Sequence, residues 1–126
     1  MEIDNAVAQA ELKEAFEAYE RALVSGDVPT INSLFWKDPR TLRYGTTDSE
    51  RHYGYDAIVA FRLQRGPVRQ NRTLQNTRIV TFGRDFGTAN TEFLIEGSDR
   101  VGRQSQTWVR TPLGWKIVNA HVSFGR

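Results

Sequence analysis

The spacing of apolar residues changes near residue 72, and this change constrains the fold more than any other feature of the chain. In residues 11 to 27, "ELKEAFEAYERALVSGD", apolar residues recur every three or four positions, which is typical of an amphipathic helix. From residue 72 onward the spacing is two, as in strands. Helices followed by a run of strands predict an α+β layer structure, in which the helices cover one face of a sheet.

The boundaries of the expected elements follow from glycine, proline and turn residues. We expect helices at about residues 4 to 25, 29 to 35 and 55 to 65, and a brief strand in "TLRY", residues 41 to 44. Four longer strands are expected in "RTLQNTRIVTF", "GTANTEFLIEG", "RVGRQSQTWVRT" and "GWKIVNAHVSF". Their connections are short enough for hairpin turns, so antiparallel pairing is expected. We predict one domain, residues 1 to 126, with N-terminal helices on a strongly curved antiparallel sheet.

The last of these strands mixes polar and apolar residues on both of its faces. One phase contains Trp115, Ile117, Asn119, His121 and Ser123, and the other contains Lys116, Val118, Ala120, Val122 and Phe124. Two explanations are compatible with this pattern and with each other. The sheet is covered on both sides, for instance by a second subunit, or its concave face lines a part-polar cavity. The second phase would otherwise expose apolar side chains, so it predicts a homodimer formed through the outer face.

Composition excludes several classes of function. The chain has no cysteine and only two histidines, so neither a thiol nucleophile nor a dedicated zinc cluster is expected. No apolar run approaches the roughly 18 residues of a membrane span, and the acidic N-terminus is unlike a signal peptide. The net charge of +2 is weak support for nucleic-acid binding. We therefore expect a cytoplasmic protein that binds neither membranes nor nucleic acid.

Basic residues are concentrated in the second half of the chain. Residues 61 to 126 hold 11 Lys and Arg against 4 Asp and Glu, whereas residues 1 to 60 hold 6 against 11. Of the 17 basic residues, 14 are arginine, whose side chain can bind a carboxylate through two parallel hydrogen bonds. Genomic base composition explains the arginine bias equally well, so the bias alone leaves acid binding open.

Two residues are candidates for a catalytic role. Tyr19 lies in the middle of the apolar stripe of the first helix, so its phenol points inward, either as a core tyrosine or as a site residue. Arg43 faces either solvent or, with Thr41 and Gly45, a cavity, where a buried guanidinium needs an anion. Gly45 favours the cavity because a glycine leaves room for a ligand. We predict that Arg43 points inward and that its partner is a substrate carboxylate.

Four further residues are candidates for substrate binding. Arg62 lies on the inward side of the last helix, where it either holds a carboxylate or extends over the helix end. His121, in the last strand, is either a hydrogen-bonded core residue or a base. Gln106 and Trp108 alternate in phase with Gln104 on the preceding strand. The sequence leaves open whether these three side chains point to the concave face of the sheet.

Several blocks of the chain resemble a known family. "LFWKDPRTLRYG", "YGYDAIVAFR" and "GWKIVNAHVSF" resemble the SnoaL-like, ketosteroid-isomerase-like (nuclear-transport-factor-like) superfamily of cone-shaped α+β proteins. More narrowly, "LFWKDPRTLRYG", "TFGRDFGTANTEF" and "GRQSQTWVRTPLGWKIVNAHVSF" are similar to the small AtzH-type, or HpxZ-type, proteins associated with amidases in bacterial cyanuric-acid and ureide catabolism. The resemblance implies a conical fold, usually dimeric through the sheet, with a pocket between helices and sheet.

The resemblance also implies an activity: a decarboxylating amidohydrolase step that converts an N-carboxylated urea, such as 1,3-dicarboxyurea, to allophanate. The family's activity-linked residues map to Tyr19 and Arg43. The implied partners are a small dicarboxylate-like substrate, a second copy of the chain and, functionally, an amidase. No cofactor or metal is expected, because the urea carbonyl accepts the electrons. The alternative is a non-catalytic small-acid-binding or amidase-accessory protein. A steroid- or polyketide-type isomerase or dehydratase would need a carboxylate base and a larger apolar cavity.

Overall fold

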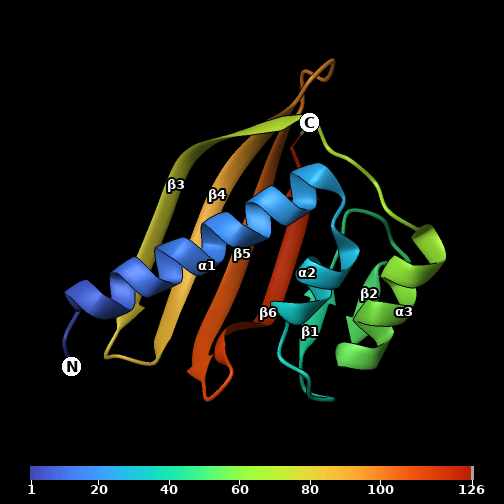
Figure 1. Ribbon diagram of the computed structural model, residues 1–126. Helices are drawn as coiled ribbons and strands as arrows, with labels where there is room; N and C mark the ends of the chain where they lie inside the picture. Colours follow the sequence, from blue (N-terminus) through green and yellow to red (C-terminus); the bar gives the residue numbers. More distant parts are fainter. Residues whose placement is uncertain (126) are drawn as a thin grey trace.

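The computed structural model describes residues 1–125, and in this range helices pack on one curved sheet (Figure 1). The helices are α1 (Ala6–Ser25), α2 (Val28–Ser33) and α3 (Tyr55–Arg65), and the strands are β1 (Leu42–Tyr44), β2 (Arg51–Tyr53), β3 (Arg72–Phe82), β4 (Phe86–Ile95), β5 (Val101–Thr111) and β6 (Gly114–Phe124). The predicted α+β class is confirmed. No helix in the described range is long and apolar enough to cross a membrane.

The sheet has the strand order β2-β1-β6-β5-β4-β3. Strands β3 to β6 form the antiparallel meander that their short connections predict. The sheet as a whole is mixed, because β1 pairs in parallel with β6. Strand β2, which pairs with β1, was not predicted, since the three residues "RHY" are too few to show an alternating pattern.

Helix α1 lies across the sheet and supplies much of the core (Figure 1). The Asn5 side chain caps its N-terminus by accepting a hydrogen bond from the Ala8 N–H, and Gly26 ends it with a left-handed φ of 76°. Its buried side chains include Leu12, Phe16 and Tyr19, which belong to one core with residues of the sheet. Burial of a side chain such as Leu12 contributes about 1.5–3 kcal/mol.

A β-bulge explains the mixed faces of the last strand. The register of β5 and β6 shifts between Thr107 and Trp108, so that Val118 is an extra residue on β6. The side chains that face the helices are therefore Trp115 and Ile117 before the bulge and Ala120, Val122 and Phe124 after it, whereas Asn119 and His121 lie on the outer face. The expected exposed apolar stripe was wrong, because Ala120, Val122 and Phe124 point inward. The homodimer stays a prediction, but the apolar residues of β6 no longer support it.

Candidate functional site

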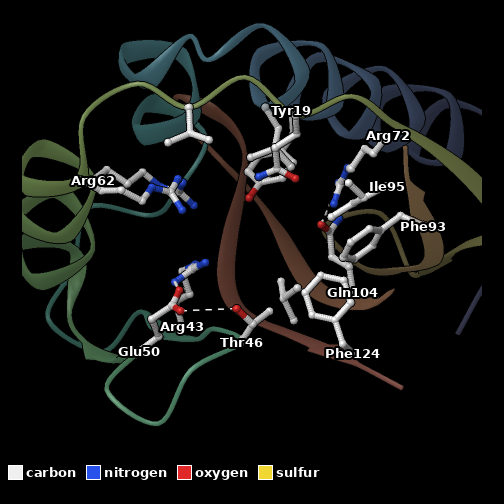
Figure 2. A pocket seen from close by; sticks show the side chains of 15 residues that line it. Tyr19, Arg43, Thr46, Glu50, Arg62, Arg72, Phe93, Ile95, Gln104 and Phe124 are labelled. Carbon is white, nitrogen blue, oxygen red and sulfur yellow. Dashed lines mark hydrogen bonds and ion pairs between the residues drawn. The ribbon is translucent and has the colours of Figure 1, made fainter. Parts of the chain in front are cut away.

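A cavity of ≈ 240 Å³ lies between α1, α3, the β1–β2 hairpin and the inner face of the sheet. Its polar lining includes Tyr19, Arg43, Glu50, Arg62, Arg72 and Gln104, and part of its wall is apolar. Figure 2 shows that Arg62 and Arg43 approach the cavity from one side and Arg72 and Gln104 from the other. Within the described residues, no group of three His, Asp or Glu side chains is placed to hold a metal ion.

Arg62 has a buried guanidinium without a carboxylate partner. The residue lies on the buried face of α3, is 1% exposed, and has its guanidinium carbon 5.8 Å from the ring centroid of Phe35. Within residues 1–125 it takes part in no ion pair, and its Nε has no hydrogen-bond partner. Burial lowers the pKa of Arg62, the neighbouring Tyr19 phenol raises it, and the positive charge of Arg43 lowers it further. An uncompensated buried charge of this kind favours binding of an anion.

Arg43 points inward, but it has a carboxylate partner within the chain. Its Nη1 lies 3.3 Å from Oε1 of Glu50 and 3.3 Å from Nδ1 of His52, which faces Arg43 across the β1–β2 pair. Because a guanidinium only donates, the His52 Nδ1 accepts this hydrogen bond. The prediction that Gly45 leaves room for a ligand was wrong, because a Cβ at this position would overlap the Glu50 side chain. Gly45 makes room for Glu50 instead.

The surroundings of Arg43 fix the protonation of its two partners. Burial raises the pKa of the Glu50 carboxyl, but hydrogen bonds from Thr47 and the charge of Arg43 outweigh this effect, and the net pKa lies below its ordinary value. Burial, and then the charge of Arg43, lower the pKa of His52, whose ring stacks on Phe61 with 4.5 Å between ring centroids. At neutral pH, Glu50 is therefore a carboxylate and His52 is uncharged.

Arg72, at the start of β3, is a buried arginine with a carboxylate partner. Its Nε donates to Oε2 of Glu20 at 3.0 Å and its Nη2 donates to Oε1 of Glu20 at 2.5 Å, a bidentate arrangement that ties β3 to α1. The same Nη2 donates to Oε1 of Gln104 at 3.1 Å. The guanidinium carbon lies 4.3 Å from the ring centroid of Phe93, within the range of a cation–π interaction.

Tyr19 projects from α1 into the cavity between these two groups of side chains (Figure 2). The residue is 4% exposed, and its ring packs edge-on against Phe35 with 6.1 Å between centroids. Its neighbours fix the ring by packing, and the phenol lies beside Arg62. Tyr19 therefore combines a fixed position with a hydroxyl group at the cavity, as a proton donor needs.

Three of the predicted substrate-binding residues do not line the cavity. Gln106 and Trp108 are 2% and 0% exposed, and the indole Nε1 of Trp108 donates to Oε1 of Gln106 at 3.0 Å. Their strand phase faces the helices, and Trp108 belongs to the hydrophobic core. His121 lies on the opposite face of the sheet, 5.5 Å from the Tyr44 ring between centroids, because the bulge at Val118 reverses the faces of β6.

The structure thus brings Tyr19, Arg43 and Arg62 to one cavity, and their roles stay predictions. Sequence reasoning missed Glu50 and Arg72. Glu50 follows an irregular loop, where no periodic pattern indicates which way a side chain points. The inward direction of Arg72 had a signal, since the residue shares its strand phase with an apolar residue two positions later.

Comparisons with known proteins agree with this architecture. Residues 1–126 match the AtzH-like family. A protein of unknown function from Pectobacterium atrosepticum is 46% identical, with a TM-score of 0.93 over 98% of this chain and 95% of that chain. A cystatin-like fold protein from Burkholderia xenovorans is also 46% identical, with a TM-score of 0.91 over 98% and 96%. An NTF2-like protein of unknown function from Pseudomonas putida, 16% identical with a TM-score of 0.79 over 94% and 87%, shares the cone fold. No curated protein matches. The chain belongs to the AtzH-like family.

Proposed function

We propose that this protein is a decarboxylating amidohydrolase that converts an N-carboxylated urea, 1,3-dicarboxyurea, to allophanate. Membership of the AtzH-like family supports a role in the nitrogen-compound catabolism that the sequence resemblance implies. The observation that carries the proposal is the buried Arg62 guanidinium, which has no carboxylate partner within residues 1–125 and lines the same cavity as the Tyr19 phenol. A homodimer and a functional association with an amidase belong to the same proposal.

The charge and size of the cavity favour a small acid over a steroid-like molecule. Of the four arginines that line it, Arg43 and Arg72 have carboxylate partners, whereas Arg62 and Arg65 have none among the described residues. The volume of ≈ 240 Å³ lies below the roughly 300–1,000 Å³ of pockets for drug-sized ligands. An isomerase would need a free carboxylate base, but Glu50, the carboxylate in the lining, is paired with Arg43.

In the proposed step, the bond between a urea nitrogen and the terminal carboxyl carbon breaks. Carbon dioxide leaves, and the electron pair stays on nitrogen, where the adjacent carbonyl group shares the negative charge. The Tyr19 hydroxyl donates the proton that the nitrogen takes up, and solvent restores that proton. Arg62 holds the carboxylate that the product retains. The apolar wall, which includes Phe93 and Phe124, weakens the solvation of the carboxylate that leaves.

Tyr19→Phe tests this proposal, because the substitution keeps the ring and its packing and removes only the hydroxyl. Release of carbon dioxide from freshly made 1,3-dicarboxyurea, corrected for the spontaneous rate, should fall by on the order of 10²–10⁴. Tyr55→Phe is the matched control, since Tyr55 packs against the core without lining the cavity, and its rate should equal that of the wild type.

Two results would contradict the proposal in different ways. Equal rates for the wild type and Tyr19→Phe, both well above the spontaneous rate, would remove Tyr19 from the mechanism. Rates at the spontaneous level for every protein would argue against an enzyme and for the small-acid-binding or amidase-accessory alternative.

A further inference from the structure

We propose that Gln104 determines the specificity of this cavity, because its Nε2 donates a hydrogen bond to an oxygen of the bound acid at the end remote from Arg62. The chemical class of ligand is an acid with a second acceptor, a carbonyl or carboxylate oxygen, a few bonds away from its first carboxylate. The inference rests on the proposed function for the identity of the natural substrate, and on the geometry for the contact itself.

The orientation of the Gln104 amide follows from its partner. Arg72 is a donor only, so the group that lies 3.1 Å from its Nη2 is the amide oxygen, Oε1. The Nε2 group of Gln104 therefore points away from Arg72. Gln104 is 2% exposed, and within residues 1–125 its Nε2 has no hydrogen-bond partner.

An unpartnered buried amide is unusual, since most buried polar groups in proteins are hydrogen-bonded. Gln104 lines the cavity, and Figure 2 shows its side chain on the side opposite Arg62. A molecule that is held at Arg62 by one carboxylate and spans the cavity reaches Gln104 with its other end. Such a molecule supplies the acceptor that Nε2 lacks.

Arg72 acts on the ligand through Gln104 and is a positioning residue. Its charge is balanced by Glu20, which binds it through two hydrogen bonds. This end of the cavity therefore selects its ligand by the direction of a hydrogen bond, whereas the Arg62 end selects by charge. The two ends together distinguish an acid with a second acceptor from a simple monocarboxylate.

Two probes separate these contributions: malonamate, which has a carboxylate and an amide carbonyl, and propionate, which has the carboxylate alone. Gln104→Met keeps a side chain of similar length without a donor. Its Kd for malonamate, measured by NMR titration, should rise roughly 2- to 10-fold, the effect of one hydrogen bond, and its Kd for propionate should not change. Arg72→Lys should show the same selective loss, because lysine keeps the charge but lacks the planar group that binds Glu20 and Gln104 together.

Gln75→Met is the matched control, because Gln75 is an exposed glutamine that donates to Glu92 and does not line the cavity, so neither Kd should change. If Gln104→Met does not fold, Gln104→Asn, which shortens the side chain, should show the same selective loss. Equal weakening of both probes, unchanged binding of both, or no binding of malonamate to the wild type would overturn the inference. Selective loss in a protein that releases no carbon dioxide would refute the proposed function and retain the role of Gln104.

Discussion

Arg62 and Arg72 are similar in type, burial and surroundings, but their pairing differs. Both are buried, both line the cavity, and both place the guanidinium over a phenylalanine ring. Arg72 has a bidentate carboxylate partner, Glu20, whereas Arg62 has no carboxylate partner within residues 1–125. Burial alone therefore does not distinguish an arginine that is paired within the fold from one that binds a ligand, as we propose for Arg62. The carboxylate partner does.

Substitution of each arginine by methionine should change the free energy of unfolding differently, and this is the largest difference that we expect between them. Arg72→Met leaves the Glu20 carboxylate, whose side chain is 16% exposed, without its partner, and should lower the free energy of unfolding by about 3–5 kcal/mol. Arg62→Met removes a buried charge that has no partner, so the free energy of unfolding should stay constant or rise. Urea unfolding measures both free energies, and equal losses in the two variants would show that the two arginines do not differ in their contribution to stability.

Binding of a small dicarboxylate should distinguish Arg62 from an arginine outside the cavity, with a smaller effect on the free energy of unfolding. Malonate at a hundredfold excess over its Kd should raise the free energy of unfolding of the wild type by about 2.7 kcal/mol. At the same malonate concentration Arg62→Met should gain almost nothing, because the charged partner of the ligand is gone. Arg78→Met removes an exposed arginine from β3 and should keep the full gain. Equal stabilisation of Arg62→Met and the wild type in thermal unfolding would show that malonate binds elsewhere.

Arg43 extends the comparison to a third arginine, and here the smallest effect is expected. The pKa of His52 is lower in the folded protein than its ordinary value of 6.5, because of burial and the charge of Arg43. As the pH falls below 6.5, the unfolded chain binds more protons than the folded one, so the free energy of unfolding decreases until the pH lies below the folded pKa.

His52→Asn keeps an acceptor for Arg43 but does not titrate, so the decrease that begins near pH 6.5 should be smaller in this variant. A separate decrease below the ordinary Glu50 value of 4.5 should persist in both proteins, because the folded pKa of Glu50 is also lowered. Urea unfolding at several pH values gives the two profiles. The same slope between pH 6.5 and 5 in both proteins would count against a role of His52.

Much of the fold was predictable because long elements repeat their pattern several times. The predicted strand "RTLQNTRIVTF" coincides with β3, and the helix expected at residues 55 to 65 coincides with α3. The three-residue strand β2 was not predictable in this way, and the parallel pairing of β1 with β6 joins segments that are far apart in the sequence. Register and bulges depend on the neighbouring strand, so the sequence showed the extra residue Val118 only as mixed faces of the last strand, a pattern that a covered sheet or a part-polar cavity explains as well.

The candidate site was predictable only where direction follows from one element alone. The apolar stripe of α1 fixed the direction of Tyr19, and the buried face of α3 fixed that of Arg62. The partner of Arg43 was not predictable, because Glu50 reaches it from a loop seven residues further on. The pairing of Arg72 with Glu20 joins residues that are 52 positions apart, so no local pattern reports it.

The bulge at Val118 determines which residues of the C-terminal half of β6 line the cavity. A substitution on β6 changes one side chain and leaves its neighbours where they are. Unbroken alternation of the same residues from Ile117 onward would instead place Asn119 and His121 on the inner face, where Ala120 and Val122 now lie. A relative with the same residues that paired β6 without the bulge would therefore present a polar wall to its ligand.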